Sequence, residues 1–225
     1  MRPPGAGRLF RTVRRVRLSD MDGSGRLRLD AIARYLQDVA SDDVADAGWA
    51  SDEHVWVVRR TELELAAPFS GDEAVELATW CSGVGASAAA RRTTIAGDRG
   101  GRVEAEVVWI HLGRDLAPLR LPQRFHDVYA PAAEGRGVST KLTLRAPDGG
   151  ATRPWPLRST DADLLGHVNN AVYWSAVEES LWPLGHAVLE YRRPIDVGDT
   201  VELSTADRRL AFTVGAELRA AASAR

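Results

Sequence analysis

A short polar segment in the second half of the chain carries the residues best suited to chemistry. Asp163, His167, Asn169 and Asn170 fall within eight residues, and an apolar stretch with helical periodicity follows at once. The first turn of a helix offers unpaired N–H groups and partial positive charge, so it can stabilise an oxyanion. A carboxylate there can act as a general base or nucleophile toward an acyl carbonyl. The structural alternative is that Asp163 forms a turn and an asparagine caps the helix.

This segment repeats a pattern that is already present in the first half of the chain. Residues 17–26 and 158–167 both read Arg-x-x-Asp-x-Asp-x-x-Gly followed by a basic residue. Gly-Asp dipeptides at 71–72 and 198–199 follow in the same order, and a proline precedes each of them. Two matches in one order indicate a tandem duplication with a shortened second copy.

Each copy is predicted to contain a strand, one long helix and then an antiparallel run of strands. Apolar residues recur at helical spacing over 30–47, and residues 170–181 form a second helix that is apolar nearly all round. The segments that alternate or are rich in β-formers are 55–65, 74–82, 88–96, 102–112, 187–194, 200–206 and 210–218. An antiparallel sheet wrapped around one long helix is the α+β arrangement called a hotdog. We therefore predict a tandem (double) hotdog, with domains at 8–130 and 138–225 and a Pro/Gly-rich linker at 131–137.

Composition excludes several classes of protein. The 225 residues are 44% hydrophobic and 27% charged, as in a globular protein, and the net charge of −2 gives no reason to expect nucleic acid binding. No apolar run approaches the roughly 18 residues of a membrane span, and the N-terminus lacks the apolar core of a signal peptide. We expect a cytoplasmic protein without membrane insertion.

The cysteine and histidine residues give no sign of a metal site. The single cysteine and the five scattered histidines lack the spacing of metal ligands, so no metal is expected. Cys81 is interpreted as a small buried residue.

The segment from Asp161 to Tyr173 resembles the motif that opens the helix of hotdog thioesterases. It reads Asp-x-Asp-x-x-Gly-His-Val-Asn-Asn-x-x-Tyr. The resemblance extends along almost the whole chain to the tandem-hotdog acyl-ACP thioesterases of plants and bacteria. The other matching segments are Leu36-Gln37, Trp56-Val-Val-Arg59, Pro68-x-x-Gly-Asp72, Thr79-Trp80, Trp109, Pro118-x-Arg-Leu-Pro122 and Leu189-Glu-Tyr-Arg-Arg193. The resemblance implies hydrolysis of fatty acyl-ACP in fatty acid biosynthesis, without a cofactor.

The site of that family is matched only in part. Its Asp and His fall on Asp163 and His167, but Leu165 stands at the position of the family's Asn, and Pro194 and Ile195 replace a Glu-Cys pair. Smaller hotdog thioesterases that hydrolyse acyl-CoA commonly lack that Asn and use the Asp together with helix-end amides. The resemblance therefore implies a mechanism centred on Asp163 rather than on a cysteine nucleophile.

The candidate site residues receive roles on this basis. Asp163 would activate water or attack the thioester carbonyl, with His167 and Asn169 as its catalytic partners. The backbone N–H groups at Val168 and Asn170, at the start of the helix, would hold the developing oxyanion. A helix-end histidine that binds a backbone carbonyl is the alternative for His167.

The first copy is expected to shape the acyl pocket. Arg26 stands where the second copy has His167, and no pair of asparagines follows it. The candidate substrate-binding residues are Trp56, Val58, Trp80, Trp109 and Tyr173. For any one of the first-copy residues, an ordinary core position is the alternative. Because acyl carrier protein is acidic, a basic docking surface is expected, although solvated arginines explain the same residues. Its candidates are Arg8, Arg11, Arg14, Arg15, Arg17, Arg91-Arg92 and Arg192-Arg193.

Other functions stay open at this point. One is an acyl-CoA thioesterase, and another is a catalytically inactive acyl-binding hotdog, which would account for Leu165, Pro194 and Ile195. A hotdog dehydratase is disfavoured, because the sequence lacks the His–acid spacing that it needs. The sequence does not determine the acyl chain length, the choice between acyl carrier protein and CoA, or whether the pseudo-dimer forms a homodimer.

Overall fold

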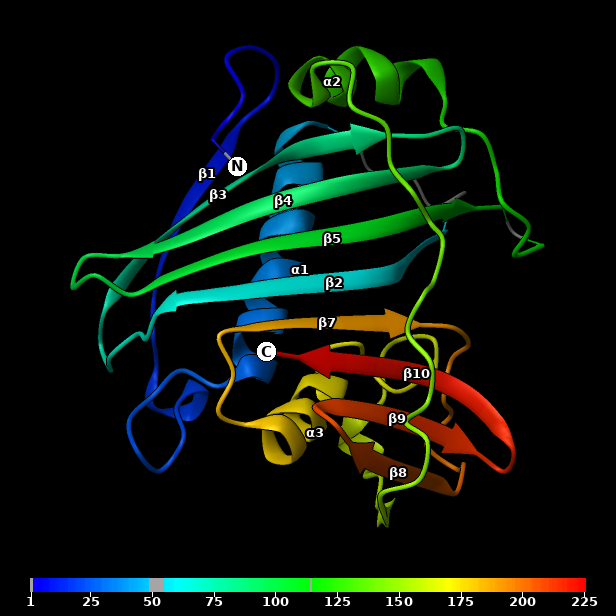
Figure 1. Cartoon of the computed structure of the whole chain (residues 1–225). Coiled ribbons are helices and arrows are strands. Elements are labelled where there is room, and N and C mark those ends of the chain that lie inside the picture. The colour runs from blue at the N-terminus through cyan, green and yellow to red at the C-terminus, as the bar shows by residue number, and fades with distance from the viewer. Residues whose placement is uncertain (1, 49–54, 114) are drawn as a thin grey trace.

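The computed structural model of the chain describes residues 2–48, 55–113 and 115–225. Within these residues, ten strands form one antiparallel sheet, in the order β1-β3-β4-β5-β2-β7-β10-β9-β8-β6 (Figure 1). The strands of the first copy are β1 Phe10–Arg15, β2 Val55–Ala67, β3 Ala74–Val84, β4 Ala88–Gly97 and β5 Arg102–Leu112. Those of the second are β6 Ala151–Trp155, β7 His186–Tyr191, β8 Val201–Ala206, β9 Arg209–Val214 and β10 Glu217–Ala224. The two halves join where β2 pairs with β7, with Thr61 opposite Leu189.

Two helices bury their apolar sides in one core with the inner face of the sheet. Helix α1 (Leu29–Asp46) contributes Ile32, Leu36 and Val39, whose spacing places them on one face. Helix α3 (Val172–Leu181) contributes Trp174, which has no exposed surface. Gly48 follows α1 with a φ of +62°, the left-handed conformation that commonly ends a helix. The α+β arrangement predicted from the two helical patterns is therefore present, with the two half-sheets fused into one.

A third helix was not expected from the sequence. Helix α2 (Gln123–Ala133) packs Phe125 and Tyr129 into a cluster with Cys81 of β3. The predicted linker at 131–137 is wrong in its first part, because α2 continues to Ala133. Pro131 stands in the last turn of this short helix, where few backbone hydrogen bonds remain to be lost.

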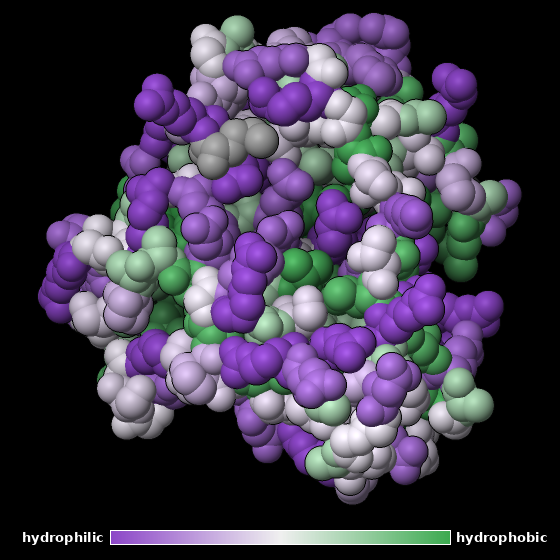
Figure 2. Space-filling model, viewed as in Figure 1, coloured by the Kyte–Doolittle hydropathy of each residue, from purple (hydrophilic) through white to green (hydrophobic). Residues whose placement is uncertain are grey.

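In the structure the linker is the segment 134–150 between α2 and β6 (Ala151–Trp155), and it crosses the outer face of the sheet (Figure 1). The carboxylate of Glu190 on β7 fixes it there, because it accepts hydrogen bonds of 2.9 Å from the backbone N–H groups of Thr143 and Leu144. Glu190 is 1% exposed. The face drawn in Figure 2 is mostly hydrophilic, as expected where one side of an antiparallel sheet is solvated. Among the described residues, no helix is long and apolar enough to span a membrane.

The second copy differs from its predicted elements at three places. The segment 210–218 is not one strand, because a turn at Gly215, with a φ of +56°, separates β9 from β10. The strand predicted to end at residue 194 ends at Tyr191, because the N–H groups of Arg192 and Arg193 both donate to the carbonyl of Arg219, which interrupts the regular ladder. Helix α3 begins two residues later than predicted, after Asn170 has formed part of a turn.

Candidate active site

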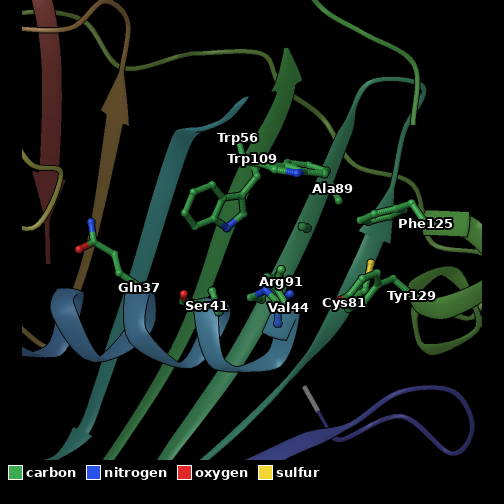
Figure 3. A pocket seen from close by; sticks show the side chains of 12 residues that line it. Gln37, Ser41, Val44, Trp56, Cys81, Ala89, Arg91, Trp109, Phe125 and Tyr129 are labelled. Carbon is green, nitrogen blue, oxygen red and sulfur yellow. The ribbon is translucent and has the colours of Figure 1, made fainter. Parts of the chain in front are cut away.

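A partly open cavity of about 280 Å³ lies between α1 and the strands of the first copy (Figure 3). From α1 it is lined by Gln37, Ala40, Ser41 and Val44, which share one face of the helix. At 1.5 Å per residue, these four positions extend for about 10 Å along the helix axis. The other lining residues are Trp56, Cys81, Ala89, Ala90, Arg91, Trp109, Phe125 and Tyr129.

A second, small cavity of about 20 Å³ adjoins the first and reaches the start of α3. Gln37 and Trp109 line both cavities. The small cavity is also lined by Asn170 and Ala171, which directly precede α3, and by Val58 of β2. The two cavities together follow α1 from the N-terminus of α3 toward α2.

The predicted pocket residues separate into two groups. Trp56 and Trp109 line the larger cavity and Val58 the smaller one, whereas Trp80 and Tyr173 line neither. Trp80 neighbours Cys81 on β3, and because successive side chains of a strand point to opposite faces, it lies on the other side of the sheet. Placing it in the pocket was therefore wrong.

Tyr173 is likewise a core residue rather than a pocket residue. Its ring packs at 5.5 Å from that of Trp155 and at 5.1 Å from that of Phe212, between centroids. Burial raises the pKa of the Tyr173 hydroxyl well above its ordinary value, although a hydrogen bond with the backbone of Ile195 opposes the shift. Cys81, in contrast, lies at the cavity wall and is 4% exposed, and burial raises the pKa of its thiol. It is a buried residue, as expected.

One wall of the larger cavity is charged, which the sequence analysis missed. Asp43 of α1 is 1% exposed, and its two oxygens accept hydrogen bonds of 2.6 Å from Arg8 and Arg91. Arg91 lines the cavity, with its guanidinium 5.7 Å from the centroid of the Tyr129 ring. The sequence contains one sign of this buried charge. Asp43 stands four residues after Val39 and therefore falls on the buried face of the predicted helix.

Asp163 closes a tight turn before α3. Its Oδ1 accepts hydrogen bonds from the backbone N–H groups of Leu165 at 2.8 Å and His167 at 3.2 Å. Oδ1 of Asp163 therefore forms the turn, as the structural alternative for this residue predicts. Oδ2 receives no hydrogen bond from the described residues. Asp163 is partly exposed and lines neither cavity. Leu165, at the position of the family's Asn, is 61% exposed.

The first copy contains the same turn. Asp22 Oδ1 accepts hydrogen bonds from the N–H groups of Ser24 at 2.9 Å and Arg26 at 3.0 Å. Hydrogen bonds from the Ser24 hydroxyl and the Arg26 backbone lower the pKa of Asp22 to about 2. Asp22 and Asp163 therefore perform one structural task in the two copies.

His167 points to a partner that was not predicted. Its Nε2 lies 3.7 Å from Oδ1 of Asp196, in the loop after β7. The two side chains are 37% and 68% exposed. Asp196 follows directly after the two positions where the family's Glu-Cys pair is missing, so a carboxylate is present near that place in the chain.

The backbone amides before α3 are not equally available. The N–H of Val168 donates to the carbonyl of Ile195 at 2.7 Å, so Val168 does not fit the oxyanion role predicted for it. The N–H of Asn169 donates to the carbonyl of Asp161 at 2.9 Å. In the part of the chain that the structure describes, the N–H of Asn170 has no acceptor, and Asn170 lines the small cavity.

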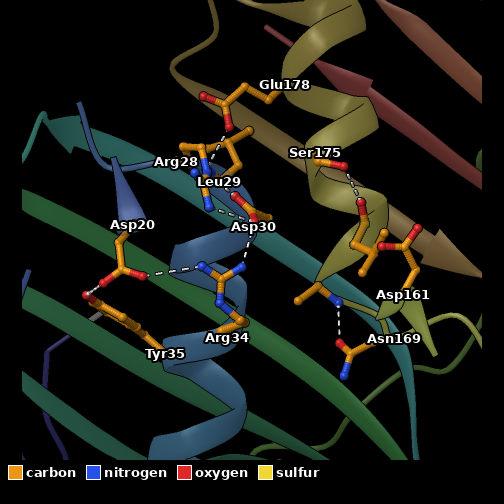
Figure 4. Close-up of polar contacts among 12 residues, drawn as sticks. Asp20, Arg28, Leu29, Asp30, Arg34, Tyr35, Asp161, Asn169, Ser175 and Glu178 are labelled. Carbon is orange, nitrogen blue, oxygen red and sulfur yellow. Dashed lines mark hydrogen bonds and ion pairs between the residues drawn. The ribbon is translucent and has the colours of Figure 1, made fainter. Parts of the chain in front are cut away.

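The side chain of Asn169 organises the start of α3. Its Oδ1 accepts a hydrogen bond of 2.9 Å from the N–H of Ala171 (Figure 4). The same oxygen accepts one of 3.0 Å from Nε2 of Gln37 on α1. Tyr191 donates a hydrogen bond of 3.0 Å to the carbonyl of Asn170. Oδ1 of Asn169 therefore has a structural role at the start of α3, and Gln37 of the first copy lies within hydrogen-bond distance of it.

Among the described residues, no group of three or more His, Cys, Asp or Glu side chains is arranged to hold a metal ion.

The fold and the cavity define a double-hotdog protein with a mostly apolar cavity beside its first helix. Each copy matches a protein-family model. Residues 7–129 match the acyl-ACP thioesterase N-terminal domain, and residues 145–221 match the acyl-ACP thioesterase C-terminal domain. The chain belongs to the acyl-ACP thioesterase family.

Individual relatives agree with this assignment. An uncharacterized protein of Mycobacterium tuberculosis is 34% identical over 97% of this chain and 92% of its own length. The chloroplastic oleoyl-acyl carrier protein thioesterase 1 of Arabidopsis thaliana is 23% identical over 89% of this chain and 64% of its own length. The solved 12:0-ACP thioesterase of Umbellularia californica has the same fold, with a TM-score of 0.78 over 95% of each chain at 17% identity.

Proposed function

We propose that the protein is a thioesterase that hydrolyses fatty acyl-ACP to free fatty acid and acyl carrier protein. Family membership supports the reaction class. The observation that carries the proposal is the pair of adjoining cavities, which begins at the start of α3 and follows α1 among mostly apolar side chains. An acyl chain in this space would have its thioester beside Asn170.

The chemistry assigned to this position uses groups of the second copy. The free N–H of Asn170 would donate to the thioester oxygen as negative charge develops on it. Asp163, through Oδ2, would take a proton from the attacking water or attack the carbonyl carbon itself. In the first route the water oxygen forms the new C–O bond, the C–S bond breaks, and the proton taken by Asp163 passes to the thiolate of the carrier. In the second route Asp163 forms an acyl anhydride as the thiolate of the carrier leaves. A water then cleaves the anhydride, which releases the fatty acid, restores the carboxylate and supplies the proton of the thiol. His167, paired with Asp196, would orient the carboxylate or the thioester.

The cavity volume favours a chain of medium length. A protein cavity of about 150 Å³ holds benzene, which has six carbons. The larger cavity, at about 280 Å³, is nearly twice that size. It would therefore hold on the order of ten to twelve carbons by simple scaling.

The test of this function is thiol release from a series of acyl-ACP and acyl-CoA substrates, with Asp163→Asn beside the wild type. Asparagine keeps the acceptor oxygen of the turn and removes the charge, so folding should be preserved. Loss of a general base should reduce kcat by about 10²–10⁴-fold. Asp22→Asn is the matched control, because it changes the same turn in the first copy, and it should keep wild-type activity.

Each other outcome has a definite meaning. Wild-type activity in Asp163→Asn would refute the role of Asp163. A preference for acyl-CoA would assign a different carrier. Acyl chains that bind without thiol release from any substrate would identify an inactive acyl-binding protein.

A further inference from the structure

The duplication relates residues of the two copies one to one around their helices. Arg17 and Arg158 open the repeated motif and are 141 residues apart. The same offset relates matching hydrogen bonds: the N–H of Arg28 donates to the carbonyl of Asp20 at 3.0 Å, as that of Asn169 donates to Asp161 at 2.9 Å. The offset therefore holds in space as well as in sequence.

Applied further, this offset pairs Leu29 with Asn170 and Gln37 with Glu178. Leu29 and Asn170 occupy equivalent positions at the starts of α1 and α3. Gln37 and Glu178 each reach from one helix to the beginning of the other. The molecule thus contains two pseudo-equivalent sites, and each combines the N-terminus of one helix with a polar side chain of the other.

The first of these sites is closed. Oε2 of Glu178 accepts a hydrogen bond of 2.7 Å from the N–H of Leu29 (Figure 4). The other oxygen of Glu178 is paired with Arg26, whose guanidinium lies 3.4 Å from the centroid of the Trp182 ring. A carboxylate oxygen therefore occupies the position at which an oxyanion would bind at this helix end.

The second site has the same framework but is open. Its equivalent N–H, that of Asn170, has no acceptor among the described residues, and Asn170 lines the small cavity. Gln37 donates a hydrogen bond to Asn169 instead. Its side chain is a neutral amide, whereas Glu178 at the equivalent position carries a negative charge. One of the two Nε2 hydrogens serves Asn169, so one donor remains where the two cavities meet.

We propose that Gln37 of the first copy is a catalytic residue of the site in the second copy. Its remaining N–H donates to the thioester oxygen together with the N–H of Asn170, which makes two donors for the oxyanion. This inference rests on the proposed thioesterase function. It assigns to the first copy a direct part in catalysis in addition to the lining of the acyl pocket.

The decisive variant is Gln37→Glu, which rebuilds in the open site the side chain that closes the other. Its carboxylate would accept the hydrogen bond of the Asn170 N–H, as Glu178 accepts that of Leu29, and it would repel the developing oxyanion. We expect a loss in kcat of about 10²–10³-fold at pH 8, the usual effect of one oxyanion donor. Protonation removes the block, so the ratio of variant to wild-type activity should rise as the pH falls toward about 4.3, the ordinary pKa of glutamate.

Two further variants separate catalysis from structure. Gln37→Met has no donor and no charge, so it should lower kcat at every pH with little change in KM and without the pH-dependent recovery. Glu178→Gln changes the equivalent position of the closed site and should keep wild-type activity. Thermal unfolding of each variant shows whether the fold is preserved.

The outcomes distinguish this inference from the proposed function. An active wild type together with active Gln37→Glu and Gln37→Met would overturn the role of Gln37 and leave the thioesterase function standing. Equal losses at every pH in both variants, expressed mainly in KM, would also overturn it, since Gln37 would then only hold Asn169. A wild type that releases no thiol would refute the function itself and the role of Gln37 with it.

Discussion

Removing the carboxylate of Asp43 should destabilise the protein strongly, because two guanidiniums depend on it. Its side chain is 2% exposed, and both oxygens are engaged at 2.6 Å, by Arg8 and by Arg91. Arg8 has a second, exposed partner in Asp46, whereas Arg91 is 14% exposed and stands at the wall of the cavity. In Asp43→Leu the Arg91 charge therefore remains in a largely apolar environment without its carboxylate.

The expected cost follows from this geometry. Breaking a buried ion pair by removal of one partner costs about 3–5 kcal/mol, mostly because the remaining charge is left unpaired. A protein of this size loses about 2–4 °C in Tm for each kcal/mol. Asp43→Leu should therefore unfold about 10 °C below the wild type. In the double variant Asp43→Leu/Arg91→Met the unpaired charge is gone, and we expect roughly half of the lost stability to return.

Urea denaturation and thermal unfolding of the wild type, both single variants and the double variant measure this coupling. The physical reasoning would be refuted by an Asp43→Leu variant within 1 kcal/mol of the wild type. It would also be refuted if the losses of the two single variants simply added in the double one. Either result would mean that Arg91 finds sufficient solvent or another acceptor without Asp43.

Two more predictions concern other buried carboxylates. Glu73 is 1% exposed; burial alone would raise its pKa, but backbone hydrogen bonds from Ser70, Gly101 and Arg99 outweigh burial and lower the pKa below its ordinary value. The stability that Glu73 contributes is therefore present above the unfolded-state pKa and is lost as pH falls through the folded-state pKa. In denaturation experiments, Glu73→Gln should be less stable than the wild type at pH 7. The difference in stability should shrink toward pH 3. Glu190→Ala removes the carboxylate that accepts hydrogen bonds from the linker at 134–150. Limited proteolysis should therefore cut this segment faster than in the wild type. Equal cutting rates would contradict the role of Glu190 in holding the linker.

Much of the architecture could be predicted from the sequence, because it depends on local periodicity and on an internal repeat. The helix expected at 30–47 is α1 at 29–46, and the four strands expected after it begin at the predicted residues. The weaker predictions fall where local pattern is poor. Helix α2 contains a proline and follows a proline-rich stretch, so its burial against β3 outweighs an unfavourable local sequence.

The site was predictable only in part, for a different physical reason. The sequence by itself indicated the segment from Asp163 to Asn170 for the proposed chemistry, since residue types and their spacing are local properties. Only the tertiary structure decided which groups are available there. The N–H of Val168 donates to Ile195, and Asn169 holds the start of α3. Among the described residues, the N–H of Asn170 has no acceptor. These partners are set by packing between distant segments.

The same contrast applies to the two copies. The repeat, visible in the sequence, determined that there are two helix ends of one kind. Which of them is closed depends on Gln37 and Glu178, each of which lies on the opposite helix and far away in the chain. A carboxylate neutralised by Arg26 fills one helix end, and a neutral amide leaves the other free. That difference arises from contacts between the copies, and such contacts exist only after the chain has folded.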